Sequence, residues 1–312
     1  MNRYAANQIL MAPILVFMLF ISGCLFPQDR AVPVEVRGEP TGHTAPGEGF
    51  SFRLGIAAVL SPGQLHKAYA PLADLLAEDL GQPVDLVQRT TYNEMNLMVQ
   101  RREVDMAFVC SLAYVLGRQG GFMEPLAIPV VDGQRHYRSC LVVRRDDPAE
   151  DLSDLEGRDF AFTDALSFSG RLTAVYWLME KGHSPWEFFS SVTYTYSHDN
   201  SLRAVARGVV DGAVVDSLVL ERMLEWEPEI DQRLKVLSCS EEVGTPPFVV
   251  HPQTDAGLKR ALTAFLTSLH ETPEGQQALA QMGVDRFDAP DDEAYDLVAR
   301  MWDHVQTYES DH

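Results

Sequence analysis

Two serines and a glycine stand where a strand-like stretch of the sequence gives way to a helix-like one. The stretch is DALSFSG, residues 164–170, and the helical pattern RLTAVYWLMEKG follows it. The first turn of a helix offers unpaired backbone N–H groups and the positive end of the helix dipole, which both favour an anion. Ser167 and Ser169 would add hydroxyl donors, and Gly170 would let the backbone approach a ligand closely. The stretch therefore indicates an anion site, with N-capping by serine as the alternative.

A histidine and an aspartate occupy similar junctions farther along the chain. His198 lies in YTYSHDNS, between a strand and a helix, where it could donate a hydrogen bond to an oxyanion. A surface or structural histidine is the alternative. Asp216 ends the apolar strand GAVVD, where a buried carboxylate without a partner would be costly. Asp216 therefore needs a donor, and a protonated ligand oxygen would supply one.

An internal repeat links these positions to earlier ones. VDMAFVCS aligns with VDGAVVDS at an offset of 106 residues, and the same offset pairs Ser61 with Ser167 and Tyr92 with His198. One offset that fits three loops predicts two similar α/β lobes. Ligands bind beyond the carboxyl ends of strands in such sheets, so both lobes should face one cleft. The candidates from the first lobe are Ser61, Tyr92, Cys110 and Ser111.

Short apolar strands alternate with amphipathic helices from residue 51 onward, which predicts α/β architecture with largely parallel sheets. We expect strands in FRLGIAAV, PVDLVQ, DMAFVC, YRSCLVVRR, RDFAFT, SVTYTY and DGAVV. We expect helices in LHKAYAPLADLLAEDLG, YNEMNLMVQRR, RLTAVYWLMEKG and NSLRAVARG. The tail predicts one helix from about Lys259 to Met282 and another from about Asp292 to Val305.

The first 23 residues have the pattern of a bacterial export signal. Arg3 precedes the apolar run ILMAPILVFMLF, which is short for a membrane span, and ISGC ends at Cys24. ISGC resembles a lipobox, so residues 1–23 are expected to be a lipoprotein signal peptide and Cys24 the lipidated N-terminus. An uncleaved anchor is the alternative. Either way, the mature chain would lie outside the cytoplasm, periplasmic or on the extracellular face, with residues 24–50 as a flexible Pro- and Gly-rich tether.

Length, net charge and the motifs that are missing from the sequence exclude or disfavour several classes of function. The chain has 312 residues, 46% of them hydrophobic, and a formal net charge of −20. This length suffices for two domains, and the acidic surface disfavours nucleic acid as a partner without excluding a small anion. The sequence contains no G-x-S-x-G, Walker, H-E-x-x-H or C-x-x-C motif, and its histidines are scattered. We therefore expect neither an enzyme nor a cofactor or metal site.

The cysteines give no disulfide framework. After Cys24 the chain has Cys110, Cys140 and Cys239, an odd number, each in an apolar run. These runs favour small buried residues. A bridge from Cys140 to Cys239 between two crossing strands is the alternative.

Residues 52–270 resemble the phosphate, phosphite and phosphonate solute-binding proteins of ABC importers. The likeness is carried in order by YAPLADLLAEDLGQPVDL, TTYNEMNLMVQRREVDMAFV, YRSCLVVRRDD, DLSDLEGRDFAFTDALSFSG, YSHDNSLRAVARGVVDGAVVDS and GTPPFVV. The resemblance implies an α/β, two-lobed type II periplasmic-binding-protein fold. It also implies a hinge of two crossing strands, near residues 132–140 and 235–248.

The resemblance also implies a ligand site. The family's Ser-Thr-Ser-Gly anion loop falls on Ser167, Phe168, Ser169 and Gly170. Its histidine, acidic residue and lobe-one tyrosine fall on His198, Asp216 and Tyr92. Two positions depart from the family's pattern. Phe168 removes one hydroxyl donor but keeps its N–H, and Cys110 and Ser111 stand where the family often has polar or aromatic pocket residues.

These observations predict a monomeric, lipid-anchored solute-binding lipoprotein. It would capture a small phosphorus oxyanion between two lobes by hinge closure and deliver it to a membrane ABC permease. Lobe one would comprise residues 51–135 and 240–312, and lobe two residues 136–239. Two alternatives remain: a sensory lipoprotein that presents an oxyanion or small organic ligand to a membrane receptor, and an enzyme on the same scaffold that uses Cys110 and His198.

Overall fold

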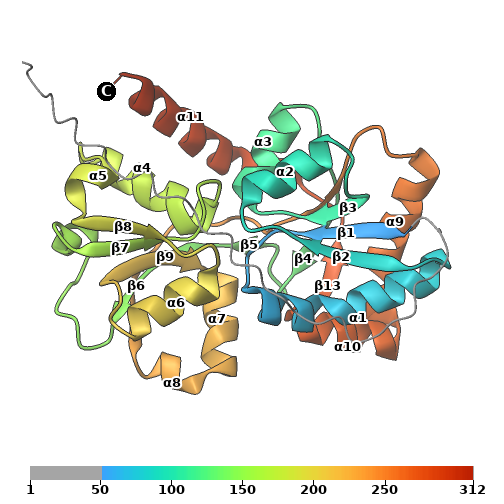
Figure 1. The fold of residues 1–312 in the computed structure, drawn as a ribbon, viewed down its shortest axis with the longest axis horizontal. Helices are drawn as coiled ribbons and strands as arrows, with labels where there is room; N and C mark the ends of the chain where they lie inside the picture. Colours follow the sequence, from blue (N-terminus) through green and yellow to red (C-terminus); the bar gives the residue numbers. More distant parts are fainter. Residues whose placement is uncertain (1–50, 312) are drawn as a thin grey trace, which may run out of the picture. The chain divides into compact units, whose positions relative to one another are not determined.

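The computed structural model describes residues 51–311 (Figure 1). The predicted signal peptide, the lipidation site Cys24 and the tether over residues 24–50 lie outside the described residues. Among the helices of the described region, none combines the length and the apolar character that a membrane crossing requires.

The first sheet has six strands in the order β13-β4-β12-β3-β1-β2. Strands β1, β2 and β3 are parallel, and β12 pairs antiparallel with both β3 and β4. The strands are β1 (Phe52–Ile56), β2 (Val84–Gln88), β3 (Met106–Phe108), β4 (Glu124–Val130), β12 (Phe248–Val250) and β13 (Arg286–Asp288). Helices cover both faces: α2 (Tyr92–Gln100) and α3 (Ser111–Gln119) on one, α1 (Pro62–Leu80) and α10 (Pro273–Met282) on the other (Figure 1).

The second sheet has five strands in the order β10-β6-β9-β7-β8. Its strands are β6 (Ser139–Arg144), β7 (Asp159–Phe162), β8 (Ser191–Tyr194), β9 (Gly212–Asp216) and β10 (Leu234–Cys239). Helices again cover both faces (Figure 1). They are α4 (Thr173–Met179), α5 (Pro185–Phe188), α6 (His198–Ala206), α7 (Ser217–Trp226) and α8 (Pro228–Asp231).

The two sheets share one plan, which agrees with the sequence repeat. In the first sheet β1 lies between β2 and β3, and in the second β7 lies between β8 and β9. All of these pairings are parallel. Each sheet then adds an antiparallel strand, β12 or β6, beside β3 or β9. The loops that follow β1, β2 and β3 in the first sheet therefore correspond to the loops that follow β7, β8 and β9 in the second.

Helix α1 shows how the sequence specifies these elements. Its side chains Leu65, Leu72 and Leu76 are at most 1% exposed, because their spacing places them on one face of the helix. Pro62 occupies the first turn, where its missing N–H costs no hydrogen bond. Gly81 ends the helix in the left-handed conformation, with φ of 64°, which a residue without a side chain adopts without strain.

The chain passes between the sheets twice, at β5 (His136–Tyr137) and β11 (Val243–Gly244). These two short strands pair antiparallel. The last helix, α11 (Asp296–Asp311), contacts α3 beside the first sheet and α4 beside the second. Contacts of α11 thus link the two halves in addition to the paired strands.

A disulfide joins Cys140 in β6 to Cys239 in β10. The two residues are direct partners in the antiparallel register, with Cα atoms 4.1 Å apart. The preference for small buried cysteines was therefore wrong for this pair, because strand pairing brings together residues that are 99 positions apart. Cys110 is buried and has a free thiol.

The expected single helix over residues 259–282 is wrong. Helix α9 (Ala256–Ser268) ends before a 3-10 turn (Leu269–Glu271), and α10 begins at Pro273. The residue before a proline disfavours the helical conformation, and Thr272 before Pro273 is extended. The Thr272 hydroxyl accepts a hydrogen bond from the N–H of Gly275 and caps α10. Helix α3, which begins three residues after the end of β3, and helix α7, which begins directly after β9, were also not predicted.

Candidate ligand-binding site

The helix N-termini that follow the paired strands carry the residues singled out in the sequence. Each pair of the repeat occupies the same helix position, at the N-cap or at the first helical residue. The N-caps are Ser61, Cys110, Ser167 and Asp216, and the first helical residues are Tyr92 and His198.

Four buried hydroxyl groups in this region have no hydrogen-bond partner. One belongs to Ser197 at the N-cap of α6, and the other three belong to Tyr92, Tyr137 and Ser169, which are at most 2% exposed. The Tyr137 hydroxyl lies near those of Ser111 and Ser169, and the Tyr92 hydroxyl lies near that of Ser167. Buried polar groups without partners are costly and rare in folded proteins. The convergence of three such donors therefore indicates a place for an acceptor-rich ligand, and we call Tyr92, Tyr137 and Ser169 the hydroxyl cluster.

Both phenols of the cluster remain donors at ordinary pH. Burial is the main cause that raises the pKa of Tyr92 and of Tyr137 well above the usual value for tyrosine, and nearby Cys110 and Asp216 act in the same direction. Neither phenol therefore ionises near neutral pH, and each keeps its proton for a hydrogen bond to a ligand.

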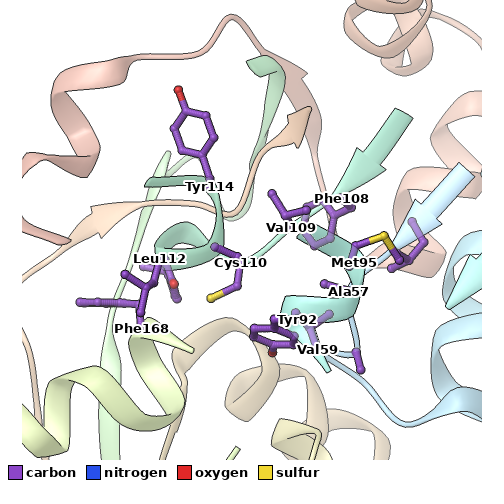
Figure 2. Close-up of a cluster of buried hydrophobic side chains, with 14 of the residues drawn as sticks. Ala57, Val59, Tyr92, Met95, Phe108, Val109, Cys110, Leu112, Tyr114 and Phe168 are labelled. Atoms are coloured by element: carbon purple, nitrogen blue, oxygen red, sulfur yellow. The ribbon is translucent and has the colours of Figure 1, made fainter. Parts of the chain in front are cut away.

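Phe168 supports the cluster instead of donating to it. Its side chain is fully buried, and its ring meets the Tyr137 ring edge to face with centroids 5.8 Å apart. Figure 2 shows Cys110 between Tyr92 and Phe168, with its sulfur on the Phe168 side. Burial raises the pKa of the Cys110 thiol to about 11, although the N–H groups of Phe168 and Leu112 oppose this. The thiol is therefore neutral, which gives no support to Cys110 as a nucleophile.

The residues of the anion loop predicted from the sequence have different roles in the structure. The Ser167 hydroxyl accepts a hydrogen bond from the N–H of Gly170 at 2.9 Å, so Ser167 serves as an N-cap. A Cβ at Gly170 would lie 2.4 Å from Thr163, so close packing within the protein requires glycine there. The Ser139 hydroxyl donates a hydrogen bond to the Ser169 carbonyl at 2.7 Å. The hydroxyl of Ser169 itself has no hydrogen-bond partner. Ser169 is therefore the side chain of this loop that can meet a ligand.

His198 is buried and neutral. Its Nδ1 accepts a hydrogen bond from the N–H of Asp216 at 3.2 Å and lies 3.2 Å from the Thr163 hydroxyl. This assigns the ring proton to Nε2, from which no described residue accepts a hydrogen bond. Burial lowers the pKa of His198 to about 3. His198 can thus donate from Nε2 as a neutral group.

We predict that the His198 ring does not titrate between about pH 5 and about pH 8, because its folded-state pKa lies near 3. Proton NMR of the ring hydrogens would check this, with the His198→Gln spectrum to assign the signal. A midpoint near the ordinary histidine value would contradict the proposed neutral donor.

Asp216 caps helix α7 from the edge of the cluster. Its Oδ1 accepts hydrogen bonds from the N–H groups of Leu218 and Val219, and the residue is 4% exposed. Burial raises the pKa of the carboxyl to about 7, and the two N–H groups oppose that rise. Among the residues that the structure describes, none donates a hydrogen bond to Oδ2. Asp216 is therefore a buried acid with one oxygen available.

Two aspartates beside the second sheet bind helix N-termini beside the first. Asp199 accepts hydrogen bonds from the Ser61 N–H at 2.9 Å and the Ser61 hydroxyl at 2.6 Å. Asp164 accepts one from the N–H of Tyr92 at 3.1 Å. Burial disfavours the charge on Asp199, but hydrogen bonds from Ser61 and Arg203 outweigh it and hold the pKa below its usual value. Ser61 thus joins the two halves, and its donors are already engaged.

Replacing Ser61 with alanine should weaken ligand binding by about 3- to 10-fold, since one hydrogen bond to a carboxylate is lost from the contact between the halves. Stopped-flow measurement of ligand release would place the effect in the off-rate. Ser153→Ala, which removes an exposed hydroxyl that accepts from Lys181, is the control and should change nothing. An unchanged release rate in Ser61→Ala would contradict the role of this contact.

The sequence analysis did not single out Tyr137, and the structure gives the Ser111 hydroxyl a partner within the fold. Tyr137 lies in β5, between the two sheets, where no periodicity marks a side chain that faces a ligand. The Ser111 hydroxyl donates to the Gly244 carbonyl at 2.9 Å, so it fastens α3 to β11. Within the part of the chain that the structure describes, no group of His, Cys, Asp and Glu side chains could hold a metal ion.

Comparisons with a family model and with known proteins all point to the same group of proteins. The model of the family described as ABC transporter, phosphonate, periplasmic substrate-binding protein matches residues 54–295. The Phosphate-import protein PhnD of Mycolicibacterium smegmatis is 29% identical over 217 residues, which are 65% of this chain and 68% of that protein. The Phosphonates-binding periplasmic protein of Escherichia coli is 26% identical over 250 residues, 78% of this chain and 73% of that one.

Two solved structures share the fold. One is a binding protein component of an ABC phosphonate transporter from Pseudomonas aeruginosa, with a TM-score of 0.77, 22% identity and coverage of 82% of this chain and 86% of that one. The other is PhnD1 from Prochlorococcus marinus in complex with methylphosphonate. It has a TM-score of 0.72 at 19% identity and covers 82% of this chain and 98% of its own.

Proposed function

The chain belongs to the family of periplasmic substrate-binding proteins of phosphonate ABC transporters, and from that premise we propose that it captures a small phosphorus oxyanion for a membrane permease. Its fold is the α/β, two-lobed type II periplasmic-binding-protein fold. The ligand class is phosphonate, phosphite or phosphate. The family consists of transport proteins, which are not enzymes.

The observation that carries the proposal is the hydroxyl cluster. Tyr92, Tyr137 and Ser169 hold three buried donors without partners, and His198 adds an N–H from Nε2. Oxygens of a phosphoryl group accept several hydrogen bonds at once, and bonds from neutral donors to a charged acceptor are stronger than neutral pairs. A phosphorus oxyanion would therefore satisfy donors that the protein alone leaves unsatisfied.

Asp216 would select among oxyanions. A phosphonate, phosphite or phosphate that keeps one proton can donate it to Oδ2 of Asp216. Sulfate carries no such proton, so above about pH 7, where Asp216 is ionised, it would meet the carboxylate with two negative oxygens facing each other. The expected selectivity thus comes from repulsion of the wrong anion as much as from attraction of the right one.

Binding would close the two lobes about a hinge. We assign residues 51–135 and 240–312 to lobe one and residues 136–239 to lobe two, since the strands of the two sheets fall within these ranges. The hinge would lie at β5 and β11, where the chain crosses between the sheets. Tyr92 comes from lobe one and Ser169 from lobe two, so a ligand that contacts both favours the closed state.

Lipid attachment at Cys24 would hold the protein at the membrane as a monomer beside its permease. The support is the sequence ISGC after an apolar run. Mass spectrometry of the mature N-terminus would check it: a diacylated Cys24 is expected, and an intact residue 1–23 segment would contradict it.

The ligand class can be tested on the protein as purified without unfolding. We expect a mass spectrum of the released small molecules to contain a phosphorus oxyanion, because a closed binding protein retains its ligand. Release of a stoichiometric ligand without phosphorus would contradict the proposal.

A further inference from the structure

The disulfide between Cys140 and Cys239 lies where the chain enters and leaves the second sheet. Cys140 is the second residue of β6, three positions after Tyr137 of β5. Cys239 is the last residue of β10, and β11 begins four positions later at Val243. Strands β5 and β11 are the paired strands between the two sheets. The disulfide therefore joins the two connections between the sheets at the point where both reach the second sheet.

Strand β10 is held weakly near its end. It is an edge strand of the second sheet, and its pairing with β6 shifts in register between Val236 and Ser238. After the shift, Ser238 and Cys239 are the last two residues that pair with β6. Interrupted pairings at a sheet edge open more readily than continuous pairings in its centre. The disulfide therefore fixes an end of β10 that a few hydrogen bonds alone would hold to β6.

Ser139 and Ser240 flank the disulfide and bind each other. The Ser240 N–H donates a hydrogen bond to the Ser139 carbonyl at 2.8 Å, and the Ser139 N–H donates one to the Ser240 hydroxyl at 3.0 Å. Ser139 is fully buried, and its own hydroxyl donates to the Ser169 carbonyl at 2.7 Å. Ser169 belongs to the hydroxyl cluster. A series of direct contacts thus leads from the disulfide to one donor of the ligand site.

The segment before Cys140 carries a second donor of the cluster, Tyr137. The next residue, Arg138, exchanges two hydrogen bonds with Ser217: its N–H donates to the Ser217 hydroxyl at 3.1 Å, and the Ser217 N–H donates to its carbonyl at 3.0 Å. Strand β6 lies between β9 and β10. The segment that follows Tyr137 is therefore held by Ser217 on the β9 side, and by Ser240 and the disulfide on the β10 side.

We propose that Cys140 and Cys239 are positioning residues for the ligand site, and that opening their disulfide weakens the capture of a phosphorus oxyanion. This inference rests on the proposed function, since the hydroxyl cluster must bind the ligand. With the disulfide closed, the donors of Tyr137 and Ser169 are ordered before the ligand arrives. With it open, the end of β10 separates from β6, and part of the binding free energy is spent on ordering this segment again.

The disulfide can be opened by a dithiol such as dithiothreitol. Cys239 is exposed, whereas Cys140 is 4% exposed, so Sγ of Cys239 is the accessible sulfur. A thiolate of the reagent attacks this sulfur and expels the thiolate of Cys140, and the second thiol of the reagent then releases Cys239. The reagent becomes a cyclic disulfide, and its two electrons and two protons convert the cysteines to thiols. Cys110 already has a free thiol, so the treatment leaves it unchanged.

Calorimetry on the oxidised and the reduced protein tests the inference, with whichever of methylphosphonate, phosphite and phosphate binds most tightly. We expect reduction to weaken binding about 10-fold. Because such coupling is reciprocal, a saturating concentration of the same ligand should stabilise the oxidised form and lower the midpoint potential of the disulfide by about 30 mV. A disulfide that only stabilises the fold would raise the free energy of unfolding but would produce neither change.

Three variants locate the effect. The double variant Cys140→Ala and Cys239→Ala should bind the ligand as the reduced protein does and should not respond to dithiothreitol. Ser240→Ala keeps the disulfide but removes the hydrogen bond to the Ser139 N–H, so the oxidised variant should bind about 3- to 10-fold more weakly. Ser238→Ala is the matched control, because it changes an exposed serine of the same strand outside this series of contacts, and its affinity should stay the same.

Equal affinities of the oxidised and reduced proteins, or a midpoint potential that the ligand does not shift, would overturn the positioning role alone. Circular dichroism would show whether the reduced protein remains folded. If it does not, an unchanged affinity of oxidised Ser240→Ala would overturn the role. Failure of the oxidised protein to bind any of the three oxyanions would overturn the proposed function together with this inference.

Discussion

Replacing Tyr137 with phenylalanine is expected to weaken phosphonate binding by about 10- to 100-fold without lowering the free energy of unfolding of the ligand-free protein. The hydroxyl is buried and has no partner in the protein, so its removal breaks no hydrogen bond within the fold. A hydrogen bond to a charged acceptor contributes about 1.5–3 kcal/mol, which sets the expected loss of affinity. Chemical denaturation and calorimetry on the same preparations would measure both quantities.

Tyr295 provides the matched control. Its hydroxyl is also buried, but it donates to the Thr245 carbonyl at 2.6 Å. Tyr295→Phe should therefore lower the free energy of unfolding by about 1–3 kcal/mol and leave affinity nearly unchanged. If Tyr137→Phe behaved in this way instead, the hydroxyl cluster would be a structural feature and not a ligand site.

Replacing Asp216 with asparagine should stabilise the ligand-free protein at alkaline pH and reduce its discrimination against sulfate. Burial raises the pKa of Asp216 from 3.8 to about 7, so the folded protein binds this proton more tightly than the unfolded chain does. The stability from Asp216 is therefore fully present below about pH 4 and is lost as the pH rises through about 7. Such a shift corresponds to about 4 kcal/mol at most.

Asparagine does not titrate and still caps a helix. Asp216→Asn should consequently unfold at a higher temperature than the unmodified protein near pH 8 and at nearly the same temperature near pH 4. In the binding site the amide would donate where the carboxylate repels, so sulfate affinity should rise relative to phosphonate by about 10-fold or more. Thermal denaturation across this pH range and calorimetry with both anions would measure these effects.

Asp255 is the control for Asp216, because it caps α9 with the same two contacts but is exposed to solvent. Hydrogen bonds from Leu258 and Gly257 lower the pKa of Asp255, so Asp255→Asn should not stabilise the protein at any pH. Equal pH profiles for the two variants would show that Asp216 is not a buried acid.

The positions where strands end could be predicted from the sequence, but the directions and contacts of the side chains that follow them could not. The 106-residue repeat placed Ser61, Tyr92 and Cys110 correctly in the segments that follow β1, β2 and β3, because residue order and strand periodicity determine those junctions. It could not show that Ser61 already donates to Asp199, since that contact depends on how the two halves meet. The same holds for Cys140 and Cys239, which strand register alone brings together.

Phe168 shows the limit of residue-type arguments. From the sequence it indicated one donor fewer in the anion loop. In the structure its ring packs edge to face with Tyr137, and the donor that matters is the Tyr137 hydroxyl from β5. Neither the position of Tyr137 between the sheets nor its lack of a partner could follow from a pattern of hydrophobic residues.

We propose that the hydroxyl cluster and Asp216 together form a site for a protonatable phosphorus oxyanion. Calorimetry with methylphosphonate, phosphite, phosphate and sulfate at one pH near 8, where Asp216 is mostly ionised, tests it most directly. We predict that at least one phosphorus oxyanion binds and that sulfate binds about 100-fold more weakly or not at all. Binding of sulfate as tight as that of the best phosphorus oxyanion, or binding of none of the four, would contradict the claim.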